Sequence, residues 1–387
     1  MDSKVILSDL VGFPSVCGTP NAAIVDYVRA YLASHQVHSH VIAGPEGDRF
    51  NLFASIGPVD RPGYVLSGHM DVVSTEGQAW GRNPFTLTND NGCNFGRGSV
   101  DMKGFLACVL AMVPEFAAMP LKRPVHIAFS YDEELGCRGV KHLLANMAPL
   151  CVRPAACIVG EPSDMQPVLS HKGKVAMELT LNGRSGHSSN PALGENAIYP
   201  AADLIGFIRD LAARVGAKGP FDTRFDPPHS TLQVGTVRGG TAVNIIPGSC
   251  TLEMEVRTIP AQSAPDIVGP VAAELKRIEN AARLAGGALE ASFAETSNYP
   301  ALAPHPDPAL AELMVELTGR PARQSVSYGT EAGLYQQAGI PAIVCGPGSI
   351  TRAHKPNEFI HDSELDQCLT MLRGLGADTA VAATPSV

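Results

Sequence analysis

The chain contains 387 residues, of which 45% are hydrophobic and 17% are charged, a composition typical of a folded protein and not of a disordered or fibrous one. The length exceeds that of one ordinary hydrophobic core and indicates about two or three domains. The formal net charge of -9 argues against a non-specific nucleic-acid binder, which would need a basic face.

The N-terminal segment, Met1–Val5, lacks the charged start and long apolar stretch of a signal peptide. No run along the chain reaches the roughly 18 apolar residues of a membrane span. Nine cysteines, scattered from Cys17 to Cys368, form neither a disulfide framework nor a paired Cys-x-x-Cys site. We therefore expect a cytoplasmic protein that does not enter a membrane.

The first part of the chain alternates between helix and strand patterns. We expect Asn21 to cap a helix whose apolar face carries Ile24, Val25, Val28 and Leu32. Strands are expected at residues 51–56, 64–66, 125–130 and 156–159, and a helix at residues 102–112. This alternation predicts an α/β sheet with helices on both faces.

The middle of the chain follows a different pattern. Residues 176–181, 231–237, 251–256 and 289–294 have the pattern of strands, and residues 196–215 and a segment beginning near Pro265 have the pattern of helices. The order strand, helix, two strands, helix, strand is typical of a small α+β sandwich of the ferredoxin-like kind.

The α/β pattern resumes after Tyr299-Pro300. A buried-looking strand is expected at residues 342–345, and a final helix opens at Ser363, with Asp366 at the spacing of a capping box. We therefore expect one larger domain built from residues 1–177 and 299–387, with a smaller domain inserted at residues 178–298.

Candidate metal ligands follow the expected strands of the larger domain. They are His69, Glu133, Glu134 and Glu161, with His354 in a loop after the strand at residues 342–345. Asp101 lies in the glycine-rich stretch Gly96–Gly104, which matches neither a P-loop nor a dinucleotide-binding motif. Ligands in an open α/β sheet gather beyond the carboxyl ends of the strands, so these side chains can converge. Nitrogen and oxygen donors suit zinc, cobalt or manganese, with zinc as the default.

Each of these residues also has an ordinary interpretation. A single glutamate at a strand end is usually a solvated loop residue, and a single histidine is more often a satisfied polar group than a ligand. The adjacent pair Glu133-Glu134, however, would repel strongly in a buried cleft without a cation. The candidates taken together therefore favour a metal site.

The sequence resembles the M20 family of metallopeptidases and deacylases over almost its whole length. The motifs that carry the resemblance are His69-Met-Asp71, Gly98-Ser-Val-Asp101-Met-Lys-Gly104, Asp132-Glu133-Glu134-Leu-Gly136, Gly160-Glu161-Pro-Ser163 and the late His354. Within the family, the chain is similar to the acetylornithine deacetylases in Phe13-Pro-Ser-Val, Gly81-Arg-Asn-Pro-Phe85, Tyr328-Gly-Thr-Glu-Ala-Gly333 and His354-Lys-Pro-Asn-Glu358. Met70 departs from the smaller polar residue expected between His69 and Asp71.

The resemblance implies two divalent metal ions, with zinc as the first expectation and cobalt as an alternative. One ion would be held by His69, Asp101 and Glu161. The second would be held by Asp101, Glu134 and His354, so that Asp101 bridges the two. The peptide bond between Asp101 and Met102 is expected to be cis.

Two further carboxylates have expected roles in this site. Asp71 would hydrogen-bond the far nitrogen of His69 and fix its tautomer, a role that the two-residue spacing also suggests. The resemblance implies that Glu133 is the general base, because a carboxylate beside a metal can take a proton from water and return it to the leaving amine.

The resemblance also assigns roles in the inserted domain, which would act as a lid and dimerisation domain. His187 would reach the active site of the partner subunit and polarise the scissile carbonyl. Asn244 and Arg257 match positions that bind the substrate's carboxylate, a task that suits the planar guanidinium. Without the resemblance, His187 and Arg257 would be interpreted as surface residues.

Glu331 is expected to bind the terminal ammonium of an ornithine side chain, and its alternative role is that of an ordinary residue at a helix start. We therefore predict a homodimeric amidohydrolase that converts N-acetyl-L-ornithine to L-ornithine and acetate by metal-activated water, in arginine biosynthesis. The alternatives are another N-acyl-amino-acid deacylase such as succinyl-diaminopimelate desuccinylase, a dipeptidase, and a non-catalytic relative that binds an amino-acid derivative.

Overall fold

The computed structural model describes residues 2–380, which belong to two compact units. Of these, residues 2–170, 302–325 and 330–380 form the first unit, and His171–Ala301 and Val326–Gly329 form the second. Residues 178 and 298, the expected ends of the inserted domain, both lie inside the second unit.

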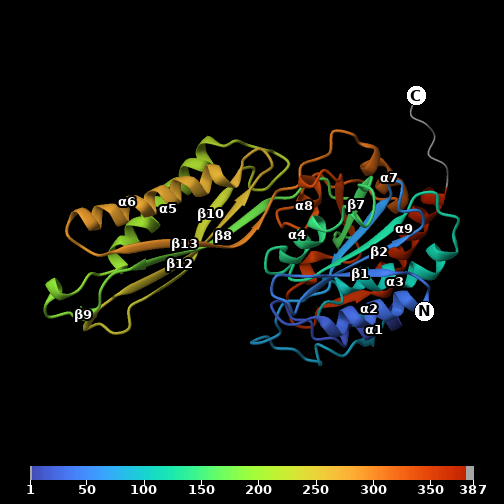
Figure 1. Ribbon diagram of the computed structural model, residues 1–387, viewed down its shortest axis with the longest axis horizontal. Helices are drawn as coiled ribbons and strands as arrows, with labels where there is room; N and C mark the ends of the chain where they lie inside the picture. The colour runs from blue at the N-terminus through green and yellow to red at the C-terminus, as the bar shows by residue number, and fades with distance from the viewer. Residues whose placement is uncertain (1, 381–387) are drawn as a thin grey trace. The chain divides into compact units, whose positions relative to one another are not determined.

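A mixed sheet forms the centre of the first unit (Figure 1). It has six strands in the order β1-β2-β6-β3-β7-β14. Its strands are β1 (Ser39–Ala43), β2 (Phe50–Ile56), β3 (Tyr64–His69), β6 (Val125–Ser130), β7 (Ala156–Pro162) and β14 (Ala342–Gly346). The four strands β6, β3, β7 and β14 run parallel, whereas β1 and β2 pair antiparallel. Strands β3, β6, β7 and β14 are buried along their whole length, which explains their continuous apolar runs.

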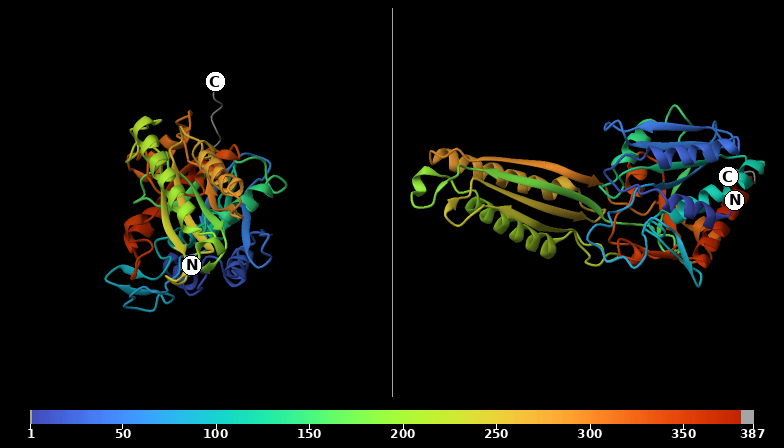
Figure 2. Two further views of the ribbon diagram at one scale, coloured as in Figure 1. Left: turned by 90° about the vertical axis from the view of Figure 1, so that its left-hand side faces the viewer. Right: turned by 90° about the horizontal axis from the view of Figure 1, so that it is seen from below.

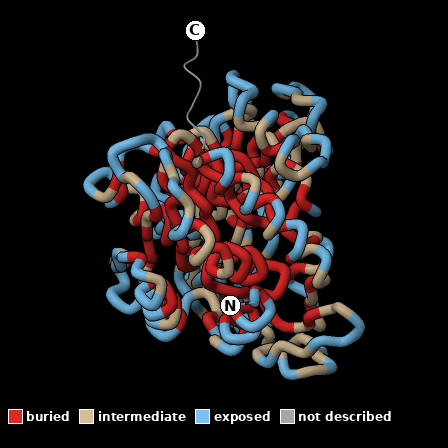
Figure 3. Tube along the Cα trace, turned by 90° about the vertical axis from the view of Figure 1, so that its right-hand side faces the viewer, coloured by how far each residue is buried: buried red, intermediate tan, exposed pale blue. Residues whose placement is uncertain are grey.

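Helices cover both faces of this sheet, so the expected α/β fold class is confirmed. The helices are α1 (Ser3–Val11), α2 (Ala22–Ser34), α3 (Lys103–Ala118), α4 (Arg138–Ala145), α7 (Ala309–Thr318), α8 (Ala332–Gln337) and α9 (Asp362–Ala380). The central helix α3 packs on β3, with α1, α2 and α9 beside it, and α4 and α8 contact each other and the opposite face. Figure 3 shows the buried segments in the middle of this unit and exposed loops around them.

A smaller sheet joins two distant parts of the first unit. Its strands β4 (Thr88–Asp90), β5 (Cys93–Phe95) and β15 (Phe359–His361) pair antiparallel in the order β15-β5-β4. The 3-10 helix η2 (Ile350–Arg352) precedes β15. The segment before Asp101 is thereby tied to the segment after His354.

The second unit is an α+β sandwich with the topology expected for a ferredoxin-like fold. Its four-stranded antiparallel sheet has the order β10-β12-β8-β13. The elements follow one another as β8 (Gly173–Asn182), α5 (Ile198–Lys218), β10 (Thr231–Gly239), β12 (Ser249–Thr258), α6 (Ala264–Leu284) and β13 (Glu290–Tyr299). Alternate residues of β8 and β12 are buried against α5 and α6, which lie along one face of the sheet (Figures 1 and 2).

Two short strands extend the second unit beyond one end of this sheet. They are β9 (Gly186–His187) and β11 (Ile245–Ile246), which pair with each other in antiparallel orientation. The 3-10 helix η1 (Pro191–Leu193) follows β9.

Two expectations about helix starts differ from the structure. Asn21 precedes α2, but its side chain does not cap the helix; it exchanges two hydrogen bonds with the backbone of Phe50 instead. The last helix begins at Asp362, one residue before the expected Ser363. For Asn21, hydrogen bonds to the distant Phe50 therefore take the place of the expected cap on the adjacent helix.

All nine cysteines are free thiols. Within residues 2–380, none of the helices combines the length and the apolar character that crossing a bilayer requires.

Candidate metal centre

The predicted metal ligands meet at one edge of the large sheet. His69 is the last residue of β3, Glu161 lies near the end of β7, and Glu133 and Glu134 lie in the turn after β6. Because β6, β3 and β7 are parallel neighbours, their carboxyl ends share this edge. Asp101 approaches from the loop before α3, and His354 from the loop after η2.

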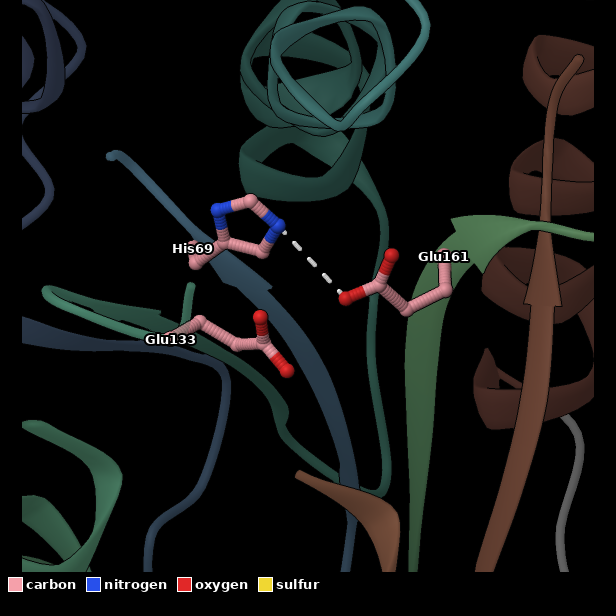
Figure 4. A group of neighbouring side chains, drawn as sticks. All are labelled: His69, Glu133 and Glu161. Atoms are coloured by element: carbon pink, nitrogen blue, oxygen red, sulfur yellow. Dashed lines mark ion pairs between the residues drawn. The ribbon is translucent and has the colours of Figure 1, made fainter. Parts of the chain in front are cut away.

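One half of the cluster is built around His69. Its Nε2 atom lies 3.1 Å from Oδ1 of Asp101 and 3.5 Å from Oε1 of Glu161. Figure 4 shows the ring of His69 and the carboxyl groups of Glu133 and Glu161 turned toward one another. The ligand atoms of these three residues lie within 4.8 Å of one another, as do those of His69, Asp101 and Glu134.

The other half is built around His354. Its Nε2 atom lies 3.2 Å from Oδ2 of Asp101 and 3.0 Å from Oε1 of Glu134. The two oxygens of Asp101 therefore face two different histidines, which is the arrangement that a bridging carboxylate requires.

The electrostatics of the cluster fit divalent cations. Burial raises the pKa of Glu133 to about 8, and it raises the pKa values of Glu134 and Glu161 above their usual range, with the charge of Asp101 acting in the same direction on the latter two. Burial also opposes the charge of Asp101, but hydrogen bonds from His354 and His69 lower its pKa. Four carboxylates face two imidazoles here, so cations coordinated by nitrogen and oxygen would neutralise the excess charge.

Asp71 contacts Nδ1 of His69 through both its backbone carbonyl and its carboxylate. The nearest partner of Nδ1 of His69 is the backbone carbonyl of Asp71, at 2.9 Å, whereas the Asp71 carboxylate lies 3.5 Å away. The two carboxylate oxygens also accept hydrogen bonds from the backbone N–H groups of Glu133 and Glu134, each at 3.1 Å. Residue 71 therefore orients the imidazole through its carbonyl and holds the Glu133-Glu134 turn through its side chain.

The backbone around the ligands includes uncommon conformations. The peptide bond between Asp101 and Met102 is cis, as expected. Asp132 and His354 have φ angles of 49° and 61°. The carboxylate of Asp132 accepts hydrogen bonds from the Gly18 N–H group at 2.7 Å and from Arg49 at 2.8 Å. Nothing in the sequence indicated the contact with Arg49, because Arg49 precedes Asp132 by 83 positions and belongs to no motif.

Glu331 is buried behind the cluster. Its side chain is 1% exposed, and its carboxylate accepts hydrogen bonds from Ser130 and, at 3.1 Å, from Ser67. The hydroxyl of Tyr335 lies 3.0 Å from the same Ser67 oxygen, which can accept its hydrogen bond. Burial raises the pKa of Glu331 to about 7. This placement differs from that of a carboxylate open to the ammonium group of a substrate.

The remaining predicted residues lie in the second unit. His187 is exposed, and its Nδ1 atom lies 2.7 Å from the Ser189 hydroxyl. Asn244 is also exposed, and its backbone carbonyl accepts a hydrogen bond from the Ser188 N–H group at 3.0 Å. The pairing of β9 with β11 therefore brings these two residues together.

Arg257 lies in the four-stranded sheet of the second unit, away from β9 and β11. It is near the end of β12, whereas Asn244 precedes the start of that strand, so roughly 26 Å of extended chain separates the two ends. The Arg257 guanidinium donates to Glu255 at 2.7 Å and to the hydroxyl of Tyr299 at 3.1 Å. One copy of the second unit therefore does not bring Asn244 and Arg257 to the same carboxylate.

Known proteins share sequence with this chain. A family model described as peptidase family M20/M25/M40 matches residues 65–377. The acetylornithine deacetylase of Shigella sonnei (strain Ss046) is 35% identical over 315 residues, which cover 81% of this chain and 79% of that protein.

Two solved structures share the fold at low sequence identity. An M20 family metallo-carboxypeptidase from Sulfolobus solfataricus is 18% identical, with a TM-score of 0.77 over 98% of this chain and all of that chain. The Bacillus subtilis YXEP protein, described as a dinuclear metal binding peptidase from the M20 family, is 18% identical, with a TM-score of 0.65 over 98% of this chain and 97% of that chain.

Proposed function

Because this chain belongs to peptidase family M20/M25/M40 and is thus a metal-dependent amide hydrolase, we propose that it hydrolyses N-acetyl-L-ornithine to L-ornithine and acetate. The same resemblance suggests that this reaction supplies ornithine for arginine synthesis in the cytoplasm. Two divalent ions are its proposed cofactors, with zinc as the first candidate and cobalt as the second.

The observation that carries this proposal is the geometry of Asp101. Its two carboxylate oxygens face His69 and His354 at 3.1 Å and 3.2 Å, and these histidines are flanked by Glu161 and Glu134 respectively. We assign one ion to His69, Asp101 and Glu161, and the other to Asp101, Glu134 and His354. The identity of 35% to an acetylornithine deacetylase supports the choice of substrate within the family.

Bound ions would supply positive charge that polarises the acyl carbonyl and lowers the pKa of water. Glu133 takes a proton from the water molecule that adds to the carbonyl carbon. Glu133 then returns this proton to the α-nitrogen as the carbon–nitrogen bond breaks, which yields acetate and the free amine. Asp71 keeps Glu133 in place through the backbone N–H groups of the turn.

The second unit is proposed to bind the substrate and to form a homodimer. The separation of Asn244 from Arg257 supports this arrangement, because in one copy they cannot hold a single substrate carboxylate together. In a dimer, Asn244 and His187 of one subunit can serve the site to which Arg257 of the other contributes. His187 would there polarise the scissile carbonyl.

A panel of substrates tests the proposed reaction. Steady-state kinetics would be measured with added zinc and with added cobalt on N-acetyl-L-ornithine, N-acetyl-citrulline, succinyl-diaminopimelate and simple dipeptides. We expect the highest kcat/KM on N-acetyl-L-ornithine. A higher value on the succinylated substrate or a dipeptide would replace the proposed activity with that of a desuccinylase or a dipeptidase. Binding without turnover on all of them would indicate a non-catalytic relative.

A further inference from the structure

A buried carboxylate outside the proposed ligand set holds the loop that carries Asp101. Glu358 is 1% exposed. Its Oε2 atom accepts hydrogen bonds from Arg97 at 2.8 Å and from the Gly98 N–H group at 3.0 Å. Its Oε1 atom accepts from the N–H groups of Val100 at 2.9 Å and Asp101 at 3.1 Å. All four acceptor positions of this carboxylate are therefore engaged by one short segment.

The guanidinium of Arg97 links the same segment to His354. Arg97 is also 1% exposed, lies over the ring of Trp80 at 5.0 Å and donates a second hydrogen bond to the side-chain oxygen of Gln78. The amide nitrogen of Gln78 donates to the backbone carbonyl of His354 at 3.2 Å. Contacts from Glu358 through Arg97 and Gln78 therefore lead back to the residue four positions before Glu358.

This network connects the two loops that present Asp101 and His354. The backbone adds a further link, because the Gly96 N–H group donates to the carbonyl of Glu358 at 3.0 Å. A buried ion pair is costly to desolvate, so such a pair adds little stability by itself. Its directional hydrogen bonds, however, restrict both loops to one conformation, which is what two metal ligands on separate loops require.

We propose that Glu358, together with Arg97, is a positioning residue that holds Asp101 and His354 at the spacing needed for two divalent ions. This inference rests on the proposed function, because it takes the ligand assignment as given. Glu358 itself is not assigned a contact with metal or substrate.

The test compares Glu358→Gln with the wild type in metal binding. The amide retains one acceptor oxygen but turns N–H donors toward two of the four groups that now donate to Glu358. Cobalt would be titrated into the metal-free proteins by calorimetry, and the visible absorption of the bound cobalt would be recorded. We expect 10- to 100-fold weaker binding, as is typical when a residue behind a ligand is changed, and a shifted cobalt spectrum. Circular dichroism would establish that the variant is folded.

Glu279→Gln is the matched control. Glu279 is also a buried carboxylate that accepts a backbone N–H bond, from Ala291 at 3.3 Å, but it lies on α6 in the second unit. We expect this variant to bind cobalt as the wild type does. If Glu358→Gln does not fold, Arg97→Lys provides the same test, because a lysine cannot reach both Glu358 and Gln78 with a planar fork.

The possible outcomes separate this inference from the proposed function. A folded Glu358→Gln or Arg97→Lys protein with wild-type cobalt affinity and spectrum would overturn the positioning role while leaving the proposed function intact. Wild-type protein that binds no cobalt would overturn both. Weaker binding in Glu279→Gln by the same factor would show that lost stability, and not loop position, causes the effect.

Discussion

At the scale of single residues, the turn after β6 directs the side chains of two adjacent glutamates, Glu133 and Glu134, toward different neighbours. The backbone N–H groups of Glu133 and Glu134 are both held by Asp71, so their side chains leave the turn in fixed directions. Glu134 contacts His354, at 3.0 Å, whereas Glu133 lies near His69 and Glu161. The adjacent charges that seemed costly in the sequence are thus directed to different neighbours.

We predict that Glu133→Gln retains both metal ions and loses about 10²- to 10⁴-fold in kcat, the usual contribution of a general base. The physical reason is that glutamine keeps the shape of the side chain but cannot accept a proton. Metal content and kcat would be measured on the same sample. Glu134→Gln is the control, since it should lose metal as well as activity. Loss of one metal ion from Glu133→Gln would show that Glu133 is a ligand.

Glu331 is the residue whose proposed role the structure changes most. Its carboxylate is fully buried and accepts from two serines, so we expect it to support the site and not to select the substrate. Glu331→Gln should therefore lower kcat/KM by the same factor on acetylornithine and on acetylmethionine. Ser67→Ala, which opens the same network from β3, should give the same pattern.

A loss of kcat/KM on acetylornithine but not on acetylmethionine would contradict this expectation for Glu331→Gln. A charge-assisted hydrogen bond to the ornithine ammonium contributes about 1.5–3 kcal/mol, which corresponds to a loss of roughly 10- to 150-fold on acetylornithine alone. Such a selective loss would restore the original assignment of Glu331 as a substrate-binding residue.

At the scale of secondary-structure elements, the sequence predicted best the strands that are buried on both faces. The strand at residues 125–130 is observed within the same limits, because all six of its side chains are buried. The edge strand β1 was missed, since its apolar run, Val41–Ala43, is only three residues long and none of its five residues is buried. Helix α3 was expected to stop near Met112 but continues through Pro114 to Ala118.

The short helices were missed for a different reason. Helix α8 has six residues and α4 has eight, lengths at which the periodic pattern of apolar residues is too short to identify. The residue before α4, Cys137, has a φ angle of 55°, which no local preference of cysteine indicates. These helices are stabilised by packing on the sheet, and α8 also places Tyr335 against Ser67.

A buried histidine in the large sheet makes the stability of the first unit depend on pH. His126 on β6 is fully buried, stacks on Phe53 and has its Nδ1 atom 2.8 Å from the Ser55 hydroxyl. Burial lowers its pKa from 6.5 to about 4. The unfolded chain therefore binds this proton more readily than the folded one, so the stability from the neutral ring is complete above pH 6.5 and is lost as the pH falls toward 4.

We predict that His126→Phe removes this dependence. Between pH 6.5 and 4, the free energy of unfolding of the wild type should fall more steeply than that of the variant, by about 1.4 kcal/mol per pH unit. Urea unfolding at a series of pH values, followed by a probe of the first unit, measures both slopes. Equal slopes would mean that the folded protein accommodates a charged His126.

At the scale of the whole molecule, His69, Glu134 and Glu161 lie at or just after strand ends that the sequence also indicates, whereas Asp101 and His354 lie in loops that only the motifs indicate. What motifs could not predict are contacts between distant segments. The Asp71 carboxylate accepts hydrogen bonds from Glu133 and Glu134, which follow it by 62 and 63 positions in the sequence. The Glu358 carboxylate accepts one from Gly98, which precedes it by 260 positions. Such partners depend on the finished fold, and a single sequence contains no local signal for them.

Arg257 and Asn244 raise the last question, which concerns the assembly. Both were expected to bind one carboxylate, yet in a single copy Arg257 lies near the end of β12, whereas Asn244 precedes the start of that strand. His187 lies beside Asn244, in an exposed loop of the second unit. A symmetric dimer in which each subunit supplies His187 and Asn244 to its neighbour would remove this conflict, because the same contact would then occur twice.

We predict that two inactive variants, His187→Ala and Glu133→Gln, recover activity when they are refolded together. A mixed dimer contains one site that combines a wild-type Glu133 with a wild-type His187 from the partner, and a second site that has neither. Random pairing of equal amounts makes half of the dimers mixed, so about a quarter of the wild-type activity should return. Each variant refolded alone is the control, and sedimentation at assay concentration would give the oligomeric state. No recovery, or an active monomer, would show that His187 does not act across a subunit interface.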